Sequence, residues 1–216
     1  MENIVQFAER LGYSLYDYQQ ELLLSLLSNK KNVVLSSRQM GISTLLNILI
    51  TYKLVHRELI DRPYNISFVT FKFMNAYEIM SKIKNFLDLL NIKYEVNKTT
   101  INIINGGSIN FGMAKLKNAD FVYIDDCSYM KINIIEDEYP YLVLCTTGAG
   151  KYINDILDLR DDSTFSFNYV SYEKNKDHDE NWANELRNAI GDDMFNNEYD
   201  IDKVIKKYEA NKSKNS

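Results

Sequence analysis

Four short apolar runs, at residues 32–35, 66–71, 121–124 and 141–145, constrain this chain more than any other feature of its sequence. Two of them, FVYI and YLVLC, show no alternation of polar and apolar residues, which is the pattern of strands covered on both faces. The other two, NVVL and ISFVTF, are each followed by a stretch of helical periodicity. The sequence therefore predicts an α/β fold, with a mainly parallel sheet flanked by helices.

The remaining patterns extend that fold. Period-two alternation between Lys93 and Met113, interrupted by Gly106 and Gly107, predicts short strands and a hairpin. Residues 165–172 predict a further strand, and the final NKSKNS is expected to fray. Helical spacing of apolar residues predicts helices at residues 4–11, 16–27, 45–59, 74–90, 151–159, 181–189 and 200–210.

Length and composition place the chain among globular proteins. Its 216 residues, 45% hydrophobic and 25% charged, allow one large domain with a small appendage and exclude the disordered, collagenous and coiled-coil classes. No apolar run reaches the length of a membrane span, and Glu2, Glu9 and Arg10 break the pattern of a signal peptide. We therefore expect a soluble, cytoplasmic protein without a membrane partner.

Cysteine, histidine and net charge limit the chemistry further. Cys127 and Cys145 each lie in an apolar run, where a buried, reduced thiol is the common outcome. His56 and His178 have no partner at metal-ligand spacing, so we expect no structural metal. The net charge of -5 means that a nucleic-acid partner must be held by a local basic patch.

The loop from Ser36 to Thr44 stands between a predicted buried strand and a predicted helix. Such a loop directs backbone N–H groups and the positive end of the helix dipole toward one point, where phosphates bind. Gly41 and Ser43 match the usual phosphate-loop pattern, whereas Ser36 replaces its first glycine and Ile42 replaces its lysine. A plain turn between strand and helix is the alternative interpretation of this loop.

Two more strand ends carry polar residues. FVYI ends in Asp125 and Asp126, and YLVLC ends in Thr146 and Thr147. A first carboxylate at this place holds the Mg²⁺ of a nucleotide, and a second orients the attacking water. Two acids that cap a turn are the alternative. Because ligands bind at the carboxyl edge of parallel sheets, three such strand ends in order favour a nucleotide site.

Six motifs stand in an order that resembles one family. YDYQQ looks like its adenine-recognition stretch, SRQMGIST resembles its SRQ-x-GKT phosphate loop, and NGGSINFG is similar to its glycine hairpin. FVYIDDCSYM resembles its apolar run with paired acids, CTTGAGKYIND its coupling motif, and residues 179–199 the stretch that closes the domain. The family is the ATPase domain of the large terminase subunit, the DNA-packaging motor of tailed bacteriophages and herpes-like viruses. The resemblance spans residues 15–200 and implies a P-loop NTPase-like core.

The resemblance implies ATP and Mg²⁺ as cofactors. Tyr18 would pack beside the adenine, and Gln19 would offer a donor and an acceptor to its edge. A core residue is the alternative interpretation of Tyr18. The resemblance assigns nucleotide binding to Tyr18, Gln19, Ser37, Arg38, Gln39, Met40, Gly41, Ile42, Ser43 and Thr44.

The same resemblance assigns the chemistry. Arg38 would stabilise the charge of the γ-phosphate, and Ser43 and Asp125 would ligate Mg²⁺. Asp126 would position the attacking water, so that Arg38 and Asp126 are the expected catalytic residues. Thr146, Thr147 and Gly148, taken together, would couple the phosphate state to the lobe that grips DNA.

Two departures from the family motif bear on catalysis. Ile42 cannot neutralise phosphate charge as the loop lysine does, and Asp126 is one methylene shorter than the usual glutamate. Together these departures predict slow or absent hydrolysis. Lys72, Lys115 and Lys117 are candidates to replace the missing lysine from another loop.

These observations lead to two hypotheses. The first is an ATPase motor domain that couples nucleotide binding and hydrolysis to translocation of double-stranded DNA in the cytoplasm of an infected host. Its partners would be DNA, other terminase subunits or the portal, and a separate nuclease chain. The second is a catalytically degenerate paralogue that acts as an interaction or regulatory protein. In both, residues 1–172 form the ATPase-like core and residues 173–216 a small C-terminal region, without a nuclease domain.

Overall fold

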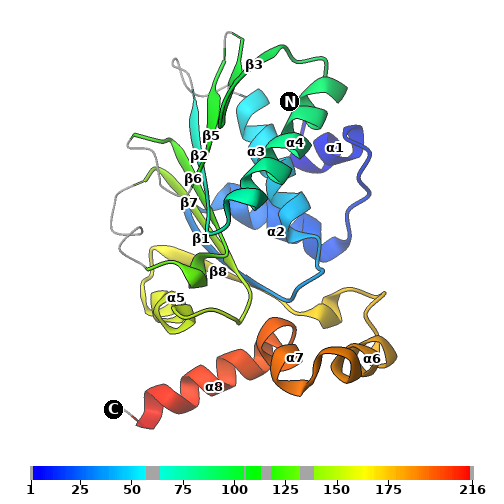
Figure 1. Cartoon of the computed structure of the whole chain (residues 1–216), viewed down its shortest axis with the longest axis vertical. Helices are drawn as coiled ribbons and strands as arrows, with labels where there is room; N and C mark the ends of the chain where they lie inside the picture. The colour runs from blue at the N-terminus through cyan, green and yellow to red at the C-terminus, as the bar shows by residue number, and fades with distance from the viewer. Residues whose placement is uncertain (1, 57–63, 105, 113–117, 132–138, 215–216) are drawn as a thin grey trace.

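The computed structural model describes residues 2–56, 64–104, 106–112, 118–131 and 139–214 (Figure 1). In these ranges the strands form one eight-stranded sheet with the order β3-β4-β5-β2-β6-β7-β1-β8. β4 pairs antiparallel with both of its neighbours, β3 and β5, and all other pairings are parallel, so the predicted mainly parallel sheet is confirmed. The strands are β1 (Lys31–Ser36), β2 (Asn65–Thr70), β3 (Tyr94–Asn97), β4 (Thr100–Ile103), β5 (Ser108–Gly112), β6 (Phe121–Asp125), β7 (Tyr141–Thr146) and β8 (Phe165–Val170).

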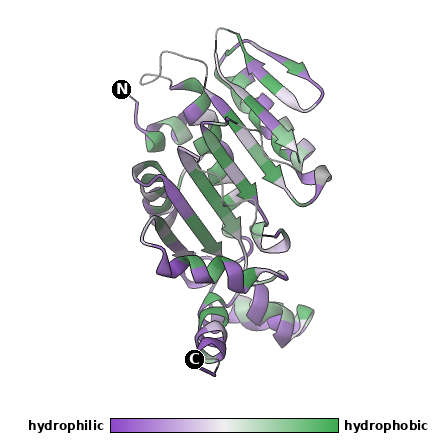
Figure 2. Ribbon diagram, turned by 90° about the vertical axis from the view of Figure 1, so that its left-hand side faces the viewer, coloured by the Kyte–Doolittle hydropathy of each residue, from purple (hydrophilic) through white to green (hydrophobic). Residues whose placement is uncertain are grey.

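Helices cover both faces of this sheet. α1 (Ile4–Arg10), α2 (Asp17–Ser28), α3 (Ile42–Val55) and α4 (Phe73–Leu89) pack on one face, and α5 (Ile153–Asp158) lies on the other (Figure 1). Within β6, Tyr123 belongs to the apolar core under α1 to α4, whereas Val122 and Ile124 belong to the core on the other side. Figure 2 shows the apolar character of the central strands. Both faces of these strands are therefore buried, as their lack of alternation predicts.

Three helices follow β8. α6 (Glu180–Ile190), α7 (Asp192–Glu198) and α8 (Ile201–Lys214) lie at the end of the sheet where β1 stops (Figure 1). Phe195 of α7 is fully buried, and its ring stacks on Tyr199 with 5.5 Å between centroids. This small aromatic core holds the C-terminal helices together. The division of the chain at residue 172 stays a prediction.

The C-terminal helices correct two expectations. Helix α7 was not expected, because its stretch holds two acids in the first turn and few apolar residues. Residues 211–214 were expected to fray but form the last turn of α8. Contacts of Lys212 hold this turn: its Nζ atom lies 2.6 Å from a carboxylate oxygen of the distant Asp161 and 3.2 Å from the hydroxyl of Tyr208, one turn earlier. Basic residues in the last turn of a helix also interact favourably with the negative end of its dipole.

Two further findings concern the described residues as a whole. None of the helices within them combines the length and the apolar character that a membrane crossing requires. Cys127 and Cys145 are both buried thiols, and burial raises the pKa of each.

Candidate functional site

A cavity of about 560 Å³ opens at the carboxyl ends of β1, β6 and β7. The pairing register aligns these ends, because Leu35 of β1 lies opposite Thr146 of β7, and Leu144 of β7 lies opposite Ile124 of β6. The sheet therefore brings together three motifs that are far apart in the sequence. Of the residues predicted for the site, the cavity is lined by Ser37, Arg38, Gln39, Met40, Gly41, Ile42, Ser43, Thr44, Asp125, Asp126, Thr146 and Thr147.

The loop between β1 and α3 has the backbone of an anion-binding turn. Gln39 and Gly41 adopt left-handed conformations with φ of 63° and 72°, and α3 begins directly after Gly41. Turns of this kind direct backbone N–H groups toward one point, and the start of the long α3 adds its dipole there. The left-handed backbone at position 41 favours glycine, and a Cβ atom there would lie 2.8 Å from Nε2 of Gln19, so that the end of this side chain would have to shift.

Tyr18 and Gln19 of α2 hold this loop through hydrogen bonds to its backbone. The Tyr18 hydroxyl and the Gln19 amide nitrogen donate to the Met40 carbonyl at 3.0 and 3.2 Å. Oε1 of Gln19 accepts from the backbone N–H of Tyr16 at 3.1 Å, so both ends of the amide are engaged. Both side chains are buried, and neither lines the cavity. Their predicted contact with adenine stays a prediction, and the burial of Tyr18 matches its alternative interpretation as a core residue.

Arg38 is held by α7. Its Nε atom donates to the carboxylate of Glu198, and its backbone N–H donates to the Glu198 carbonyl at 3.0 Å. The neighbouring Ser37 hydroxyl donates to the Tyr199 carbonyl, while the Ser37 backbone N–H donates to the Val170 carbonyl at 2.8 Å. The end of α7 therefore forms one wall of the loop. The Arg38 side chain is 45% exposed, whereas that of Glu198 is 9% exposed.

The opposite wall carries two carboxylates. Asp125 accepts a hydrogen bond from the Tyr123 hydroxyl at 2.9 Å. Burial, and secondly the charge of Asp126, raises the pKa of Asp125 to about 6. Burial also raises the pKa of Asp126, whose backbone is left-handed with φ of 50°. Next to Asp125, the buried Thr70 hydroxyl has no hydrogen-bond partner among the described residues. Polar groups with so few partners suit a bound cation and its ligands.

The position of the missing loop lysine is apolar. Ile42 is 6% exposed and packs in the core under α1 to α4. Among the other candidates, Lys72 precedes α4, and its positive charge lowers the pKa of Asp126 against the effect of burial. Lys115 and Lys117 lie outside the described residues.

The predicted coupling segment connects the cavity with the C-terminal helices. The Thr147 hydroxyl donates to the Glu198 carboxylate at 3.2 Å. Thr146 lies 2.5 Å from the Ser128 hydroxyl, oxygen to oxygen. Gly148 does not line the cavity but packs on α7 and α8, where a Cβ atom would lie 2.5 Å from the Asn197 carbonyl oxygen.

Four site residues were missed in the sequence. Asn75, Cys145 and Tyr199 line the cavity, and Glu198 holds Arg38. Gly191 followed by two acids is a helix-start signal for α7 and was the one available pointer to Glu198 and Tyr199. A single asparagine on a predicted helix carries no comparable signal.

The ligand atoms present at the site limit which metal ions it can hold. Within the described ranges, no group of three or more His, Cys, Asp or Glu side chains could hold a metal ion. Ser43 and Asp125 both line the cavity and offer two oxygen ligands. Mg²⁺ commonly takes one or two protein oxygens and completes its shell with phosphate oxygens and water. The site therefore fits a cation that arrives with a nucleotide.

No family model and no curated protein matches this sequence. Solved structures do match its fold. The large terminase ATPase domain of Thermus phage P74-26 superposes with a TM-score of 0.67 at 15% identity, over 90% of this chain and 96% of that one. This chain has the fold of a phage large terminase ATPase domain.

Two further structures extend the comparison. The large terminase of a thermophilic bacteriophage, solved in complex with ADP, gives a TM-score of 0.67 at 9% identity, over 86% of this chain and 52% of that one. A DEAD box protein from Methanococcus jannaschii gives 0.53 at 13% identity, over 89% and 61% of the two chains. The fold of this chain thus shares its central architecture with a DEAD box protein as well as with large terminases.

Proposed function

We propose that this chain is a terminase-type ATPase domain that binds ATP with Mg²⁺ and acts in packaging double-stranded DNA. One observation carries the proposal: a single cavity unites the loop at 36–44, the carboxylates of Asp125 and Asp126, and Thr146 with Thr147. The fold similarity to large terminases, one of which was solved in complex with ADP and with ATP-γ-S, supports it.

The proposed roles follow from the walls of the cavity. The loop amides and the start of α3 receive the phosphates, and Ser43 with Asp125 holds Mg²⁺. Bound there, Mg²⁺ would supply positive charge that stabilises the charge developing on the phosphates. Asp126 orients water, and Arg38 faces the terminal phosphate once Glu198 releases it. Contact of Gln19 with adenine requires the exchange of one of its present partners, the Met40 carbonyl or the Tyr16 N–H.

The partners in this proposal are DNA, other terminase subunits or the portal, and a nuclease on a separate chain. The cytoplasm of the infected host is the corresponding location. Thr146, Thr147 and Gly148 are the proposed coupling residues, since the two threonines line the cavity, and Thr147 and Gly148 contact α7 and α8.

A second function has its own support. The burial of Ile42 leaves the loop without an ammonium group, and Glu198 occupies the Nε atom of Arg38. Both features disfavour rapid hydrolysis, since loss of one charge-stabilising group typically slows a reaction about 100- to 1,000-fold. The second candidate is therefore a degenerate paralogue that binds nucleotide or a motor partner without turnover.

The first test is nucleotide binding. We expect a fluorescent ATP analogue with Mg²⁺ to bind the wild-type chain, and Gly41→Ala to weaken that binding, because its Cβ atom would displace the Gln19 amide that holds the Met40 carbonyl and because alanine is strained at a φ of 72°. Gly12→Ala is the matched control: its φ of 87° is also left-handed, but no atom lies within 4 Å of the added Cβ. Absence of binding at millimolar nucleotide would refute the proposal.

Turnover separates the two candidates. Phosphate release is measured with and without double-stranded DNA. A rate stimulated by DNA supports the motor, whereas bound nucleotide with a flat background supports the degenerate paralogue.

A further inference from the structure

A second hollow, a groove of about 370 Å³, lies between the coupling segment, α5 and α8. The two helices lie on either side of it, α5 above α8 in the view of Figure 1. Gly148, Ala149 and Gly150 form one side of the groove. Its polar side chains are Lys151, Asn154, Asn197, Lys207, Tyr208 and Asn211. The charged residues of the lining are thus two lysines, and no carboxylate belongs to it.

The acidic residues near the groove form ion pairs with basic residues outside its lining. Lys212 of α8 lies 2.6 Å from Asp161 and 3.9 Å from Asp158, and Arg160 lies 3.2 Å from Glu209. These pairs use the last residue of α5, an acid that follows it and an acid of α8. No ion pair to Lys151 or Lys207 occurs among the described residues, and both side chains are exposed. Positive charge is therefore left over at the groove, in a chain whose net charge is -5.

The remaining lining groups suit phosphate oxygens. Each of Asn154, Asn197 and Asn211 carries an NH₂ group with two donors. Lysine, asparagine and backbone N–H groups are the groups that contact the phosphates of nucleic acids.

The groove shares a wall with the nucleotide cavity. Thr146 and Thr147 line the cavity, and Gly148 to Gly150, the next residues, line the groove. Gly148 fits tightly against α8, since a Cβ atom there would lie 2.2 Å from a methyl carbon of Val204. A ligand in the groove therefore touches the same segment as a ligand in the cavity.

We propose that this groove binds the phosphodiester backbone of a nucleic acid, with Lys151 and Lys207 as its phosphate contacts. The inference deepens the proposed function, because it locates the surface that holds the DNA. Binding at the groove requires no hydrolysis.

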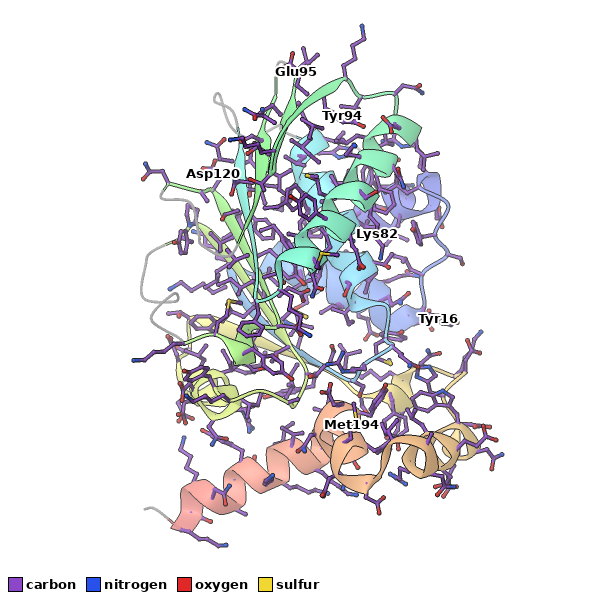
Figure 3. The ribbon with its side chains drawn as sticks, viewed as in Figure 1. Tyr16, Lys82, Tyr94, Glu95, Asp120 and Met194 are labelled. Carbon is purple, nitrogen blue, oxygen red and sulfur yellow. The ribbon has the colours of Figure 1, made fainter. Side chains whose placement is uncertain are left out.

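The experiment measures fluorescence anisotropy of a labelled 30-base-pair DNA duplex over a series of salt concentrations. The variant is Lys151→Ala with Lys207→Ala. The matched control is Lys82→Ala with Lys206→Ala, which removes the same charge from two exposed lysines outside the groove lining. Lys206 adjoins Lys207 on α8, and Lys82 lies on α4, far from the groove (Figure 3).

We expect the groove variant to bind the duplex at least about 10-fold more weakly, with a salt slope lower by about 2, since each phosphate contact contributes about 0.9. The control should keep the wild-type slope. As a second variant, Asn154→Asp places a carboxylate in the groove without changing the shape of the side chain, and it should also weaken binding.

Three results would overturn the inference. They are absence of duplex binding by the wild-type chain at low salt, an equal loss of duplex affinity in both double variants, and displacement of the duplex by polyglutamate added at the same total negative charge. The last would assign the groove to an acidic peptide. Titration with the fluorescent ATP analogue runs in parallel, and we expect it to be unchanged in every variant. If the wild-type chain binds ATP but not the duplex, the inference about the groove is refuted and the proposed nucleotide site is not. If it does not bind ATP, the proposed function is refuted, whatever the result with the duplex.

Discussion

The two walls of the nucleotide cavity differ in how far the chain satisfies its own polar groups. On the loop wall, Ser37, Arg38 and the Met40 carbonyl all have partners within the chain, and most of them come from α2 and α7. On the carboxylate wall, Asp125 has the Tyr123 hydroxyl as its side-chain partner and an elevated pKa of about 6. The Ser37 and Arg38 side chains of the loop wall are therefore paired without a ligand, whereas the Asp125 carboxylate has fewer partners than it can accept.

The difference indicates where ligand binding gains free energy. A buried carboxylate with few donors costs stability until a cation arrives, so the carboxylate wall favours Mg²⁺ with its nucleotide. The loop wall instead loses an internal ion pair if Arg38 turns toward a phosphate. We therefore expect metal dependence to follow Asp125 and the exchange of internal bonds to follow Arg38.

The largest expected effect is that of Asp125→Ala. Removal of the carboxylate should abolish the magnesium dependence of nucleotide binding and weaken binding about 100-fold, equivalent to about 2.7 kcal/mol. The ligand-free fold should keep or slightly raise its melting temperature, because a poorly satisfied buried charge disappears. Titrations and thermal melts with and without Mg²⁺ measure both. A lower melting temperature, equivalent to a loss of about 1 kcal/mol in unfolding free energy, with magnesium dependence intact, would instead identify Asp125 as a turn cap.

The next effect concerns the ion pair on the loop wall. Arg38→Ala leaves the buried Glu198 carboxylate with Thr147 as its remaining described partner, so we expect a loss of about 2 kcal/mol in unfolding free energy. Glu198→Gln should cost about 1 kcal/mol or less, because the half-exposed Arg38 stays hydrated. Chemical denaturation of both variants and of the double variant measures the coupling.

The double variant decides whether the pair acts as a unit. With a neutral amide in place of the Glu198 carboxylate no charge is stranded, so Arg38→Ala combined with Glu198→Gln should be more stable than Arg38→Ala alone. Simple addition of the two single effects would contradict this account.

The smallest effect is a dependence of stability on pH. The pKa of Asp125 is raised from 3.8 to about 6 in the folded chain, so the folded state binds this proton more tightly than the unfolded state does. The stability from this group is fully present below 3.8 and is lost as the pH rises through about 6. Between pH 7 and pH 5 the ligand-free wild type should therefore gain about 1.4 kcal/mol relative to Asp125→Asn. Parallel pH profiles of the two melting curves measure it, and identical profiles would place the titration elsewhere.

The sheet was predictable because burial on both faces leaves a direct mark on sequence. Strands such as β6 and β7 read as unbroken apolar runs, and polar residues that follow them, such as Asp125 and Thr146, must meet at one edge. The loop at 36–44 was recognisable from its place between a strand and a helix.

The rest of the site depends on tertiary contacts without a local pattern. Glu198 is a buried acid at the end of a short helix, and its partners Arg38 and Thr147 are distant in sequence. The burial of Ile42 and the tethering role of Gln19 likewise depend on packing between α2 and α3. A periodicity in one segment cannot report such contacts.

The wall that α7 gives to the phosphate loop has a consequence for how the protein is made. Ser37 and Arg38 are bonded to residues 162 and 160 positions later in the chain. β1 likewise pairs on both sides with strands that are synthesised more than 100 residues after it, β7 and β8. During translation the loop therefore emerges long before its partners, and the cavity assembles only after Glu198 and Tyr199 have left the ribosome.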